Sequence, residues 1–313
     1  MSTWGRVCIG MVLLAALSAG GAGLLRRGIY GWTVFVLAPV ILGALAGWVA
    51  QPETGGRAGG VGALTVLVTL GALLGFGLEG AICIVMAAPL ALPLGALGGW
   101  LVYRMAPSRA AASGGAAMLL LLAPAGFTWD THARPPVFTV RTAIEIAASP
   151  EQVWRRMVAF AEMPEPREWY FRAGLAYPTR ARIDGAGRGA TRYCEFSTGP
   201  VVEPIDVWDR PRRLRFHVTQ TPSPMREWSP YAQVQPKHLH GYMISRAGEF
   251  RLTPLPGNRA LLEGTSWYQH GLWPAEYWRW WSDAIVHRIH LRVFRHIQAM
   301  AEADARGQVA RSW

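Results

Sequence analysis

The sequence predicts two unlike parts, a bundle of hydrophobic membrane helices and a separate water-soluble α+β domain. The first observation is the distribution of charge, because all 8 histidines and most other ionisable residues lie after residue 130. A segment so poor in charge cannot give a soluble domain a solvated surface. The second is a series of long apolar runs before residue 128, and the third is a mixture of strand and helix patterns after residue 136. As far as Phe127 the only charged side chains are Arg6, Arg26, Arg27, Glu53, Arg57, Glu79, Arg104 and Arg109.

The apolar runs predict four to five transmembrane helices within residues 1–127. They cover residues 7–25, 29–50, 61–78, 80–103 and 115–127. A helix needs about 20 residues to cross the hydrocarbon core, so the fifth run spans only if it is tilted or the bilayer is thin. A cleaved signal peptide is the alternative for the first run, but the hydrophobic segments that follow at once favour a membrane helix. Residues 128–136 form the expected linker.

The helical part is expected to be an anchor in a bacterial cell membrane, with the soluble domain on the cytoplasmic side. The loop arginines do not decide this orientation, because the two topologies place four against four inside. Glu79 is the only ionisable residue near the interior of a run, and the glycines at 75 and 77 predict a turn beside it. We identify no proton relay or ion path there.

Composition excludes several other classes of function. The net charge of +11 comes from basic residues interleaved with acids, so we expect no nucleic-acid partner. Cys194 is the only cysteine after residue 127, which excludes a disulfide within the soluble domain. We find no phosphate-binding loop, nucleophile elbow or dinucleotide fingerprint. No cofactor and no metal are therefore expected.

The soluble domain is predicted from alternating strands that are followed by a long final helix. A strand over 137–146 precedes a helix that begins near Pro150, with Ser149 as its N-cap and Gln152 completing a capping box. A helix from about 274 to 303 closes the domain. Between these helices we expect strands over 190–197, 201–207, 214–218, 248–255 and 259–270.

This order of elements resembles the START-like, or SRPBCC, superfamily of polyketide cyclases, lipid-transfer domains and plant allergens. The segments that carry the resemblance are IEIAASPEQVWRRMVAF, GAGRGATRYCEF, VVEPIDVWDRPRRLRFHV, GEFRLTPLPGNRALLEGTSWY and the final helix. They cover about residues 137–303 and no part of the hydrophobic bundle. The resemblance implies a helix-grip domain over 137–304, in which a curved antiparallel sheet wraps around the C-terminal helix, with a tail over 305–313.

The resemblance also implies a cavity for a hydrophobic small molecule. We therefore expect a membrane-anchored domain that binds a lipid, an isoprenoid or a polyketide-like compound, with this ligand and the membrane as its partners. One alternative is an enzyme of the cyclase or dehydratase type that uses acid–base residues in the cavity. The other is a structural or regulatory membrane protein whose soluble domain docks a protein.

The final helix holds most of the candidate site residues. Asp283, His287 and His290 lie on one arc, where they suit metal binding, acid–base chemistry or a structural hydrogen-bonded cluster. No further ligand can be named for a metal there, and the pair His238 and His240 is a second, weaker possibility. A neighbouring arc faces the core or the cavity with Trp278, Trp281, Ile285, Ile289, Val293, Ile297 and Met300.

Strands and one loop supply the remaining candidates. Arg192 and Glu195 point to opposite faces of their strand, so one of them faces the cavity. Asp283, His287 and Glu263 are the candidate catalytic residues, and the loop that ends near residue 242 is expected at the cavity mouth. The predicted ligand-binding residues are Arg192, Glu195, His240, Tyr242, Trp267, Tyr268, Trp278, Trp281, Ile285 and His290.

Overall fold

A computed structural model describes residues 3–105, 122, 124–231 and 236–311. The chain divides into two compact units. The helical unit consists of Met1–Arg134, Glu227–His238 and Gly271–Trp278. The sheet unit consists of Pro135–Arg226, Leu239–His270 and Arg279–Trp313.

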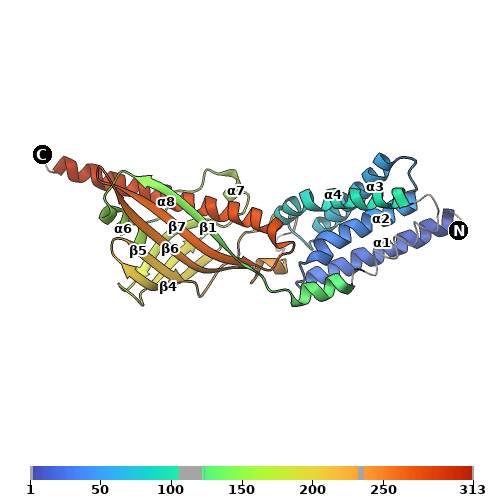
Figure 1. Ribbon diagram of the computed structural model, residues 1–313, viewed down its shortest axis with the longest axis horizontal. Helices are drawn as coiled ribbons and strands as arrows, with labels where there is room; N and C mark the ends of the chain where they lie inside the picture. The colour runs from blue at the N-terminus through green and yellow to red at the C-terminus, as the bar shows by residue number, and fades with distance from the viewer. Residues whose placement is uncertain (1–2, 106–121, 123, 232–235, 312–313) are drawn as a thin grey trace. The chain divides into compact units, whose positions relative to one another are not determined.

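The helical unit contains four helices that are long and apolar enough to cross a membrane, at Trp4–Arg26, Thr33–Ala50, Gly55–Gly75 and Ala81–Met105. This agrees with the first four predicted runs. The fifth predicted run, 115–127, lies largely outside the described residues, and residues 124–132 are helical. The elements in Figure 1 are α1 (Thr3–Arg26), η1 (Thr33–Leu37), α2 (Ala38–Ala50), α3 (Gly55–Gly75) and α4 (Ala81–Met105).

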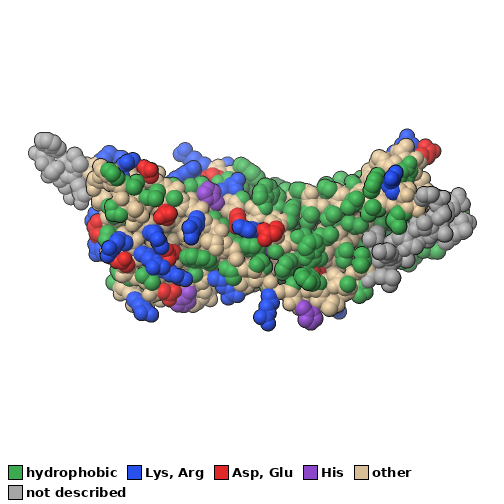
Figure 2. Space-filling model, viewed as in Figure 1, with side chains coloured by type: hydrophobic (Ala, Val, Ile, Leu, Met, Phe, Trp, Pro, Cys, Tyr) green, Lys and Arg blue, Asp and Glu red, His purple; other side chains and the backbone are tan. Residues whose placement is uncertain are grey.

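Glycines allow α2, α3 and α4 to pack with their backbones in close contact. A Cβ atom on Gly43 would lie 2.0 Å from the carbonyl oxygen of Gly95, and one on Gly62 would lie 2.1 Å from the same oxygen. Small residues at such crossings are typical of helices that associate within lipid. Away from these contacts the helices present apolar side chains outward, and Val12, for example, is 67% exposed. The surface of the helical unit in Figure 2 is accordingly mostly hydrophobic.

The sheet unit is a curled antiparallel sheet of seven strands in the order β1-β7-β6-β5-β4-β3-β2, with the long helix α8 against it (Figure 1). The predicted helix-grip class is confirmed. The strands are β1 (Val137–Ile146), β2 (Pro178–Asp184), β3 (Thr191–Phe196), β4 (Gly199–Asp209), β5 (Arg213–His217), β6 (Met243–Leu255) and β7 (Arg259–His270). The remaining helices of the chain are α6 (Pro150–Val158), α7 (Trp169–Arg172), the short η2 (Lys237–Leu239) and α8 (Ala275–Arg311). Lys237 and His238 of η2, and α8 as far as Trp278, belong to the helical unit.

Local sequence signals explain where several of these elements begin. The Ser149 side chain accepts a hydrogen bond from the Gln152 backbone N–H at 3.3 Å, and the Gln152 side chain accepts one from the Ser149 N–H at 2.9 Å. This is the predicted capping box of α6. The strand β2 was not predicted. The helix α8 continues through Gly307 to Arg311, because the Ala, Glu, Arg and Gln residues around that glycine offset its cost of about 1 kcal/mol.

The core of the sheet unit lies between the sheet, α6 and α8. Leu214, Leu262, Phe294 and Ile297 are fully buried there. Phe294 reaches the sheet over Gly264, where a Cβ atom would lie 2.4 Å from its ring. The missing side chain at residue 264 therefore lets α8 approach β7 closely and sets the depth of the space on either side of this contact.

Candidate functional site

The sheet unit has a partly open cavity of about 160 Å³ between strands β3–β7 and α8. It arises where the strands curl away from the helix, on the face to which alternate residues of each strand point. Most of its lining is apolar. The lining side chains of the strands include Arg192, Cys194, Phe196, Val201, Glu203, Phe216, Met243, Phe250, Ser266 and Tyr268, and those of α8 are Ile285, Val286, Ile289, His290, Val293 and Phe294.

One polar element of the cavity is a buried ion pair between neighbouring strands. Arg192 on β3 lies directly opposite Glu203 on β4 in the antiparallel register, and the two are only 1% and 6% exposed. The guanidinium donates hydrogen bonds to the Glu203 carboxylate and, through Nε at 3.0 Å, to the carbonyl oxygen of Val158. Burial raises the pKa of the Glu203 carboxyl, and the guanidinium of Arg192 opposes that rise.

Aromatic rings surround the charged end of Arg192. Its guanidinium carbon lies 5.9 Å from the ring centroid of Phe160, 6.0 Å from that of Phe216 and 5.6 Å from that of Phe250. The negative faces of such rings attract a cation. These contacts and the carboxylate together hold the guanidinium at the wall of a mostly apolar space.

A second polar element is a hydrogen-bonded chain that links α8 to β7 and β1. His290 contacts Ser266 Oγ through Nε2 at 2.8 Å and Thr142 Oγ1 through Nδ1 at 3.0 Å. Thr142 Oγ1 also lies 2.8 Å from Nδ1 of His287. A hydroxyl has one hydrogen to donate, so Thr142 donates to at most one of the two rings and accepts from at least one of them. Burial, and to a lesser extent His287, lower the pKa of His290 to about 4, so this ring is neutral at pH 7.

A third polar element joins Tyr268 and Asp283. The Tyr268 hydroxyl donates a 2.5 Å hydrogen bond to Asp283, whose other oxygen accepts from Arg279 Nε at 3.1 Å. Burial and the adjacent carboxylate raise the pKa of Tyr268, which keeps the phenol protonated. Asp283 is thus held from two sides and presents its oxygens to protein donors.

The predicted ligand-binding residues divide into two groups. Four of them, Arg192, Tyr268, Ile285 and His290, line the cavity. Glu195, on the opposite face of β3 from Arg192, lies 3.5 Å from Arg182 Nε. The other six predicted residues are not among the described residues that line this cavity. They are Glu195, His240, Tyr242, Trp267, Trp278 and Trp281, and their roles as ligand contacts stay predictions.

The catalytic candidates also occupy different environments. Asp283 and His287 belong to the hydrogen-bonded groups described above, and His287 is exposed. Glu263 alternates with the inward residues Leu262 and Gly264 of β7 and therefore faces away from α8. The carboxylate of Asp283 contacts the wall residue Tyr268, whereas Glu263 does not line the described cavity. All three remain predictions as catalytic residues.

Several polar residues that lie at the cavity or next to it are not among the predicted site residues. Glu203 could have been found by counting back from the β3–β4 hairpin, where Phe196 pairs with Gly199 and Arg192 therefore pairs with Glu203. Thr142 and Ser266 carry no local signal, because their contacts with His290 depend on where α8 crosses the sheet.

Comparisons with known proteins were made for the whole chain. No curated protein matches it. A solved structure from Nitrosospira multiformis is 17% identical, covers 54% of this chain and 99% of its own, and has a TM-score of 0.34. Norcoclaurine synthase from Thalictrum flavum is 11% identical, with coverages of 56% and 99% and a TM-score of 0.35. The Aha1 dimer from Colwellia psychrerythraea is 14% identical, with coverages of 51% and 93% and a TM-score of 0.29.

The comparison with family models concerns only the sheet-forming part of the chain. Residues 137–269 match the family described as polyketide cyclase / dehydrase and lipid transport. This range runs from the first residue of β1 almost to the end of β7. The predicted resemblance to the START-like superfamily is thereby confirmed, and this part of the chain is similar to the polyketide cyclase/dehydrase and lipid transport family.

Proposed function

We propose that the C-terminal domain binds a hydrophobic small molecule, such as a lipid, an isoprenoid or a polyketide-like compound, in the cavity between the sheet and α8. The observation that carries this proposal is the cavity itself, which is mostly apolar and has a few polar groups at its wall. Ligand sites commonly combine an apolar lining with a small number of polar groups that fix orientation. Arg192, Ser266 and His290 supply such groups here.

The size of the cavity restricts the part of the ligand that enters it. Its volume of about 160 Å³ is close to that of an engineered cavity of about 150 Å³ that holds benzene. One ring or a short stretch of acyl chain therefore fills the space. A larger ligand places only one portion inside, or displaces side chains such as Ile289 and Phe250.

The helical unit is proposed as the membrane anchor of this domain. Its four long helices are apolar, and their outward residues include Val68 and Val85, which are 64% and 66% exposed. Exposed aliphatic surface of this extent is unfavourable in water and is covered by lipid tails in a bilayer. A membrane also concentrates the hydrophobic ligands that the cavity suits.

Acid–base catalysis on the bound molecule is a second candidate function. The observation that favours it is His290, a neutral imidazole at the cavity wall that contacts the hydroxyl of Ser266. A neutral imidazole can accept a proton from a substrate or from a hydroxyl beside it. If the domain is an enzyme, His290→Asn should lose turnover while it still binds the ligand. If the domain is only a carrier, the wild-type chain should show no turnover.

The binding proposal is tested by native mass spectrometry of the full chain in detergent micelles, before and after extraction with organic solvent. We expect a bound mass of small-molecule size that disappears on extraction. The variant Ile289→Trp places an indole in the cavity and should reduce the bound fraction at least tenfold.

The matched control is Ala299→Trp, which adds the same side chain at an exposed position of α8 and should keep the bound mass. Equal occupancy in both variants would place the ligand outside this cavity. A wild-type chain without any bound mass, after expression in the presence of host lipids, would contradict the carrier function.

A further inference from the structure

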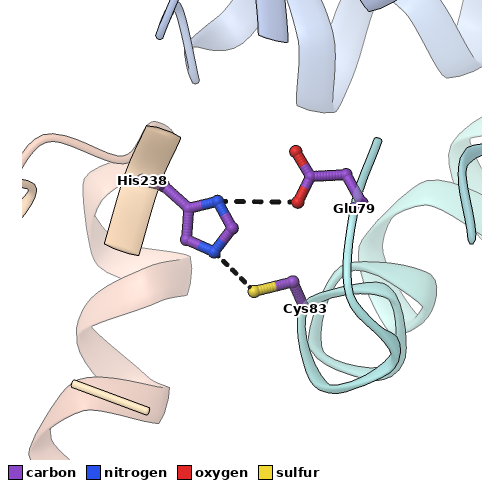
Figure 3. A group of neighbouring side chains, drawn as sticks. All are labelled: Glu79, Cys83 and His238. Carbon is purple, nitrogen blue, oxygen red and sulfur yellow. Dashed lines mark hydrogen bonds and ion pairs between the residues drawn. The ribbon is translucent and has the colours of Figure 1, made fainter. Parts of the chain in front are cut away.

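Three potential metal ligands meet within the helical unit, where His238 joins Glu79 and Cys83 from a distant part of the chain (Figure 3). Glu79 lies in the loop between α3 and α4, Cys83 in the first turn of α4, and His238 in η2. Cys83 Sγ is 2.7 Å from Nε2 of His238, and Glu79 Oε2 is 3.5 Å from Nδ1 of the same ring. Each residue offers one ligand atom, and these atoms lie within 4.8 Å of one another.

The Glu79 carboxylate is buried and has one oxygen without a hydrogen bond. The residue is 5% exposed. Its Oε1 accepts a 2.8 Å hydrogen bond from the Tyr30 hydroxyl, whereas Oε2 has no hydrogen-bond partner among the described residues and faces His238. A buried carboxylate oxygen with no donor is costly unless a cation is placed beside it.

The surroundings of the cluster favour a positive ion. The Glu227 carboxylate accepts hydrogen bonds from the backbone N–H groups of Ile82 and Cys83, at 3.1 and 3.2 Å, and so adds a second acid close to the thiol. A thiolate and the Glu79 carboxylate would together carry two negative charges in a buried site. A divalent cation neutralises both, and buried charges persist in proteins when they are paired in this way.

The donor set matches the preferences of one class of metal. Sulfur, imidazole nitrogen and carboxylate oxygen are the three ligand types that Zn²⁺ uses in proteins. In a tetrahedral zinc site, sulfur and nitrogen ligands are about 3.6 Å apart, given bonds of about 2.3 and 2.1 Å. The present Sγ–Nε2 distance of 2.7 Å would therefore open by about 0.9 Å on zinc binding, which small side-chain rotations can supply.

We propose that Glu79, Cys83 and His238 bind one Zn²⁺ ion, with Tyr30 orienting the carboxylate through its hydrogen bond to Oε1. Three protein ligands leave a fourth coordination position for water or another small ligand. The three residues also line a largely apolar cavity of about 110 Å³ within the helical unit. The fourth position is thus accessible from a space enclosed by the helices.

The proposal is tested on the full chain in detergent with Co²⁺, which replaces Zn²⁺ and reports thiolate ligation through a near-ultraviolet charge-transfer band. The double variant Cys8→Ser/Cys194→Ser leaves Cys83 as the only cysteine. We expect this variant to bind one equivalent of Co²⁺ with the charge-transfer band, and one equivalent of Zn²⁺ by elemental analysis. Zn²⁺ should abolish the band by displacing Co²⁺.

Three further variants test two of the ligands and the residue that orients the carboxylate. Cys83→Ser should lose the band, and Glu79→Gln should weaken zinc binding at least tenfold while both elute from size exclusion as the wild type does. Tyr30→Phe should lower the affinity by about 10-fold to 100-fold, as loss of a partner that orients a ligand does. A hydrogen-bonded Cys–His–Glu cluster without a metal function would give no band and no stoichiometric zinc in wild type or in the double variant. That result would overturn the proposal.

Discussion

The Arg192–Glu203 pair allows the energetics of the cavity to be tested with a single substitution. Glu203→Gln keeps the shape of the side chain and removes its charge, so the guanidinium of Arg192 remains buried without a counter-ion. Arginine cannot lose its proton in a protein to relieve this cost. Its other contacts include the Val158 carbonyl at 3.0 Å and three aromatic rings.

The expected loss of stability follows from the burial of the pair. Removal of one partner from a buried ion pair costs about 3–5 kcal/mol, and Arg192 is 1% exposed. The matched control lies on the other face of the same strand, where Glu195 contacts an Arg182 side chain that is 49% exposed. Exposed pairs contribute about 0–1 kcal/mol, so Glu195→Gln should change stability by less than about 1 kcal/mol.

The assay is hydrogen exchange of the full chain in detergent, read by mass spectrometry on peptides of β3 and β4. Opening free energies of these strands report the stability of the sheet unit. The double variant Arg192→Met/Glu203→Leu replaces both charges with apolar groups and should recover most of the loss. The reasoning is refuted if Glu203→Gln and Glu195→Gln have similar effects, or if the double variant is as unstable as Glu203→Gln.

Two other predictions concern helix packing and pH. Gly62→Ala places a Cβ against the Gly95 carbonyl and should destabilise the helical unit by about 1–3 kcal/mol. Gly60→Ala in the same helix meets nothing within 4 Å and should not destabilise it. Thermal unfolding of both variants in detergent measures the difference. The pKa of His290 is lowered from 6.5 to about 4 by burial and by His287. Between pH 4 and 6.5 the His290 imidazole therefore binds a proton in the unfolded chain but not in the folded one. The stability of the sheet unit should accordingly fall as pH decreases from about 6.5 toward 4. Unfolding of His290→Asn measured across this range should lack that part of the slope.

The two-part fold could be predicted because the amino-acid composition differs between the two parts of the chain, and because several elements have strong local sequence signals. The apolar runs identified four helices, and Ser149 with Gln152 marked the start of α6. Strand β2 was missed because it is partly polar and lies at the edge of the sheet, where pairing with β3 rather than its own pattern defines it. The end of α8 was placed too early because a single glycine was read as a helix terminator.

The candidate sites were harder to predict because each depends on register or on distant contacts. The alternation of side chains along a strand placed Arg192 and Glu195 on opposite faces of β3. Which of the two faces the cavity could be decided only from the position of α8. The contact between His290 and Ser266 depends on the same crossing. Glu79 stood out in the sequence as an acid in an apolar segment, but its meeting with His238, 159 positions later, has no local signal.

The ligand cavity and the proposed zinc site have a common physical feature, which is a small number of polar groups held in apolar surroundings. They share no residue, and they belong to different units of the chain. In the sheet unit the buried charge of Arg192 already has a protein counter-ion, so the cavity needs no additional ion to be stable. In the helical unit Glu79 keeps a buried oxygen without a hydrogen bond, and that difference is why a cation is inferred at one site and an apolar molecule at the other. Failure of zinc binding would therefore leave the ligand proposal intact, and an empty cavity would leave the zinc proposal intact.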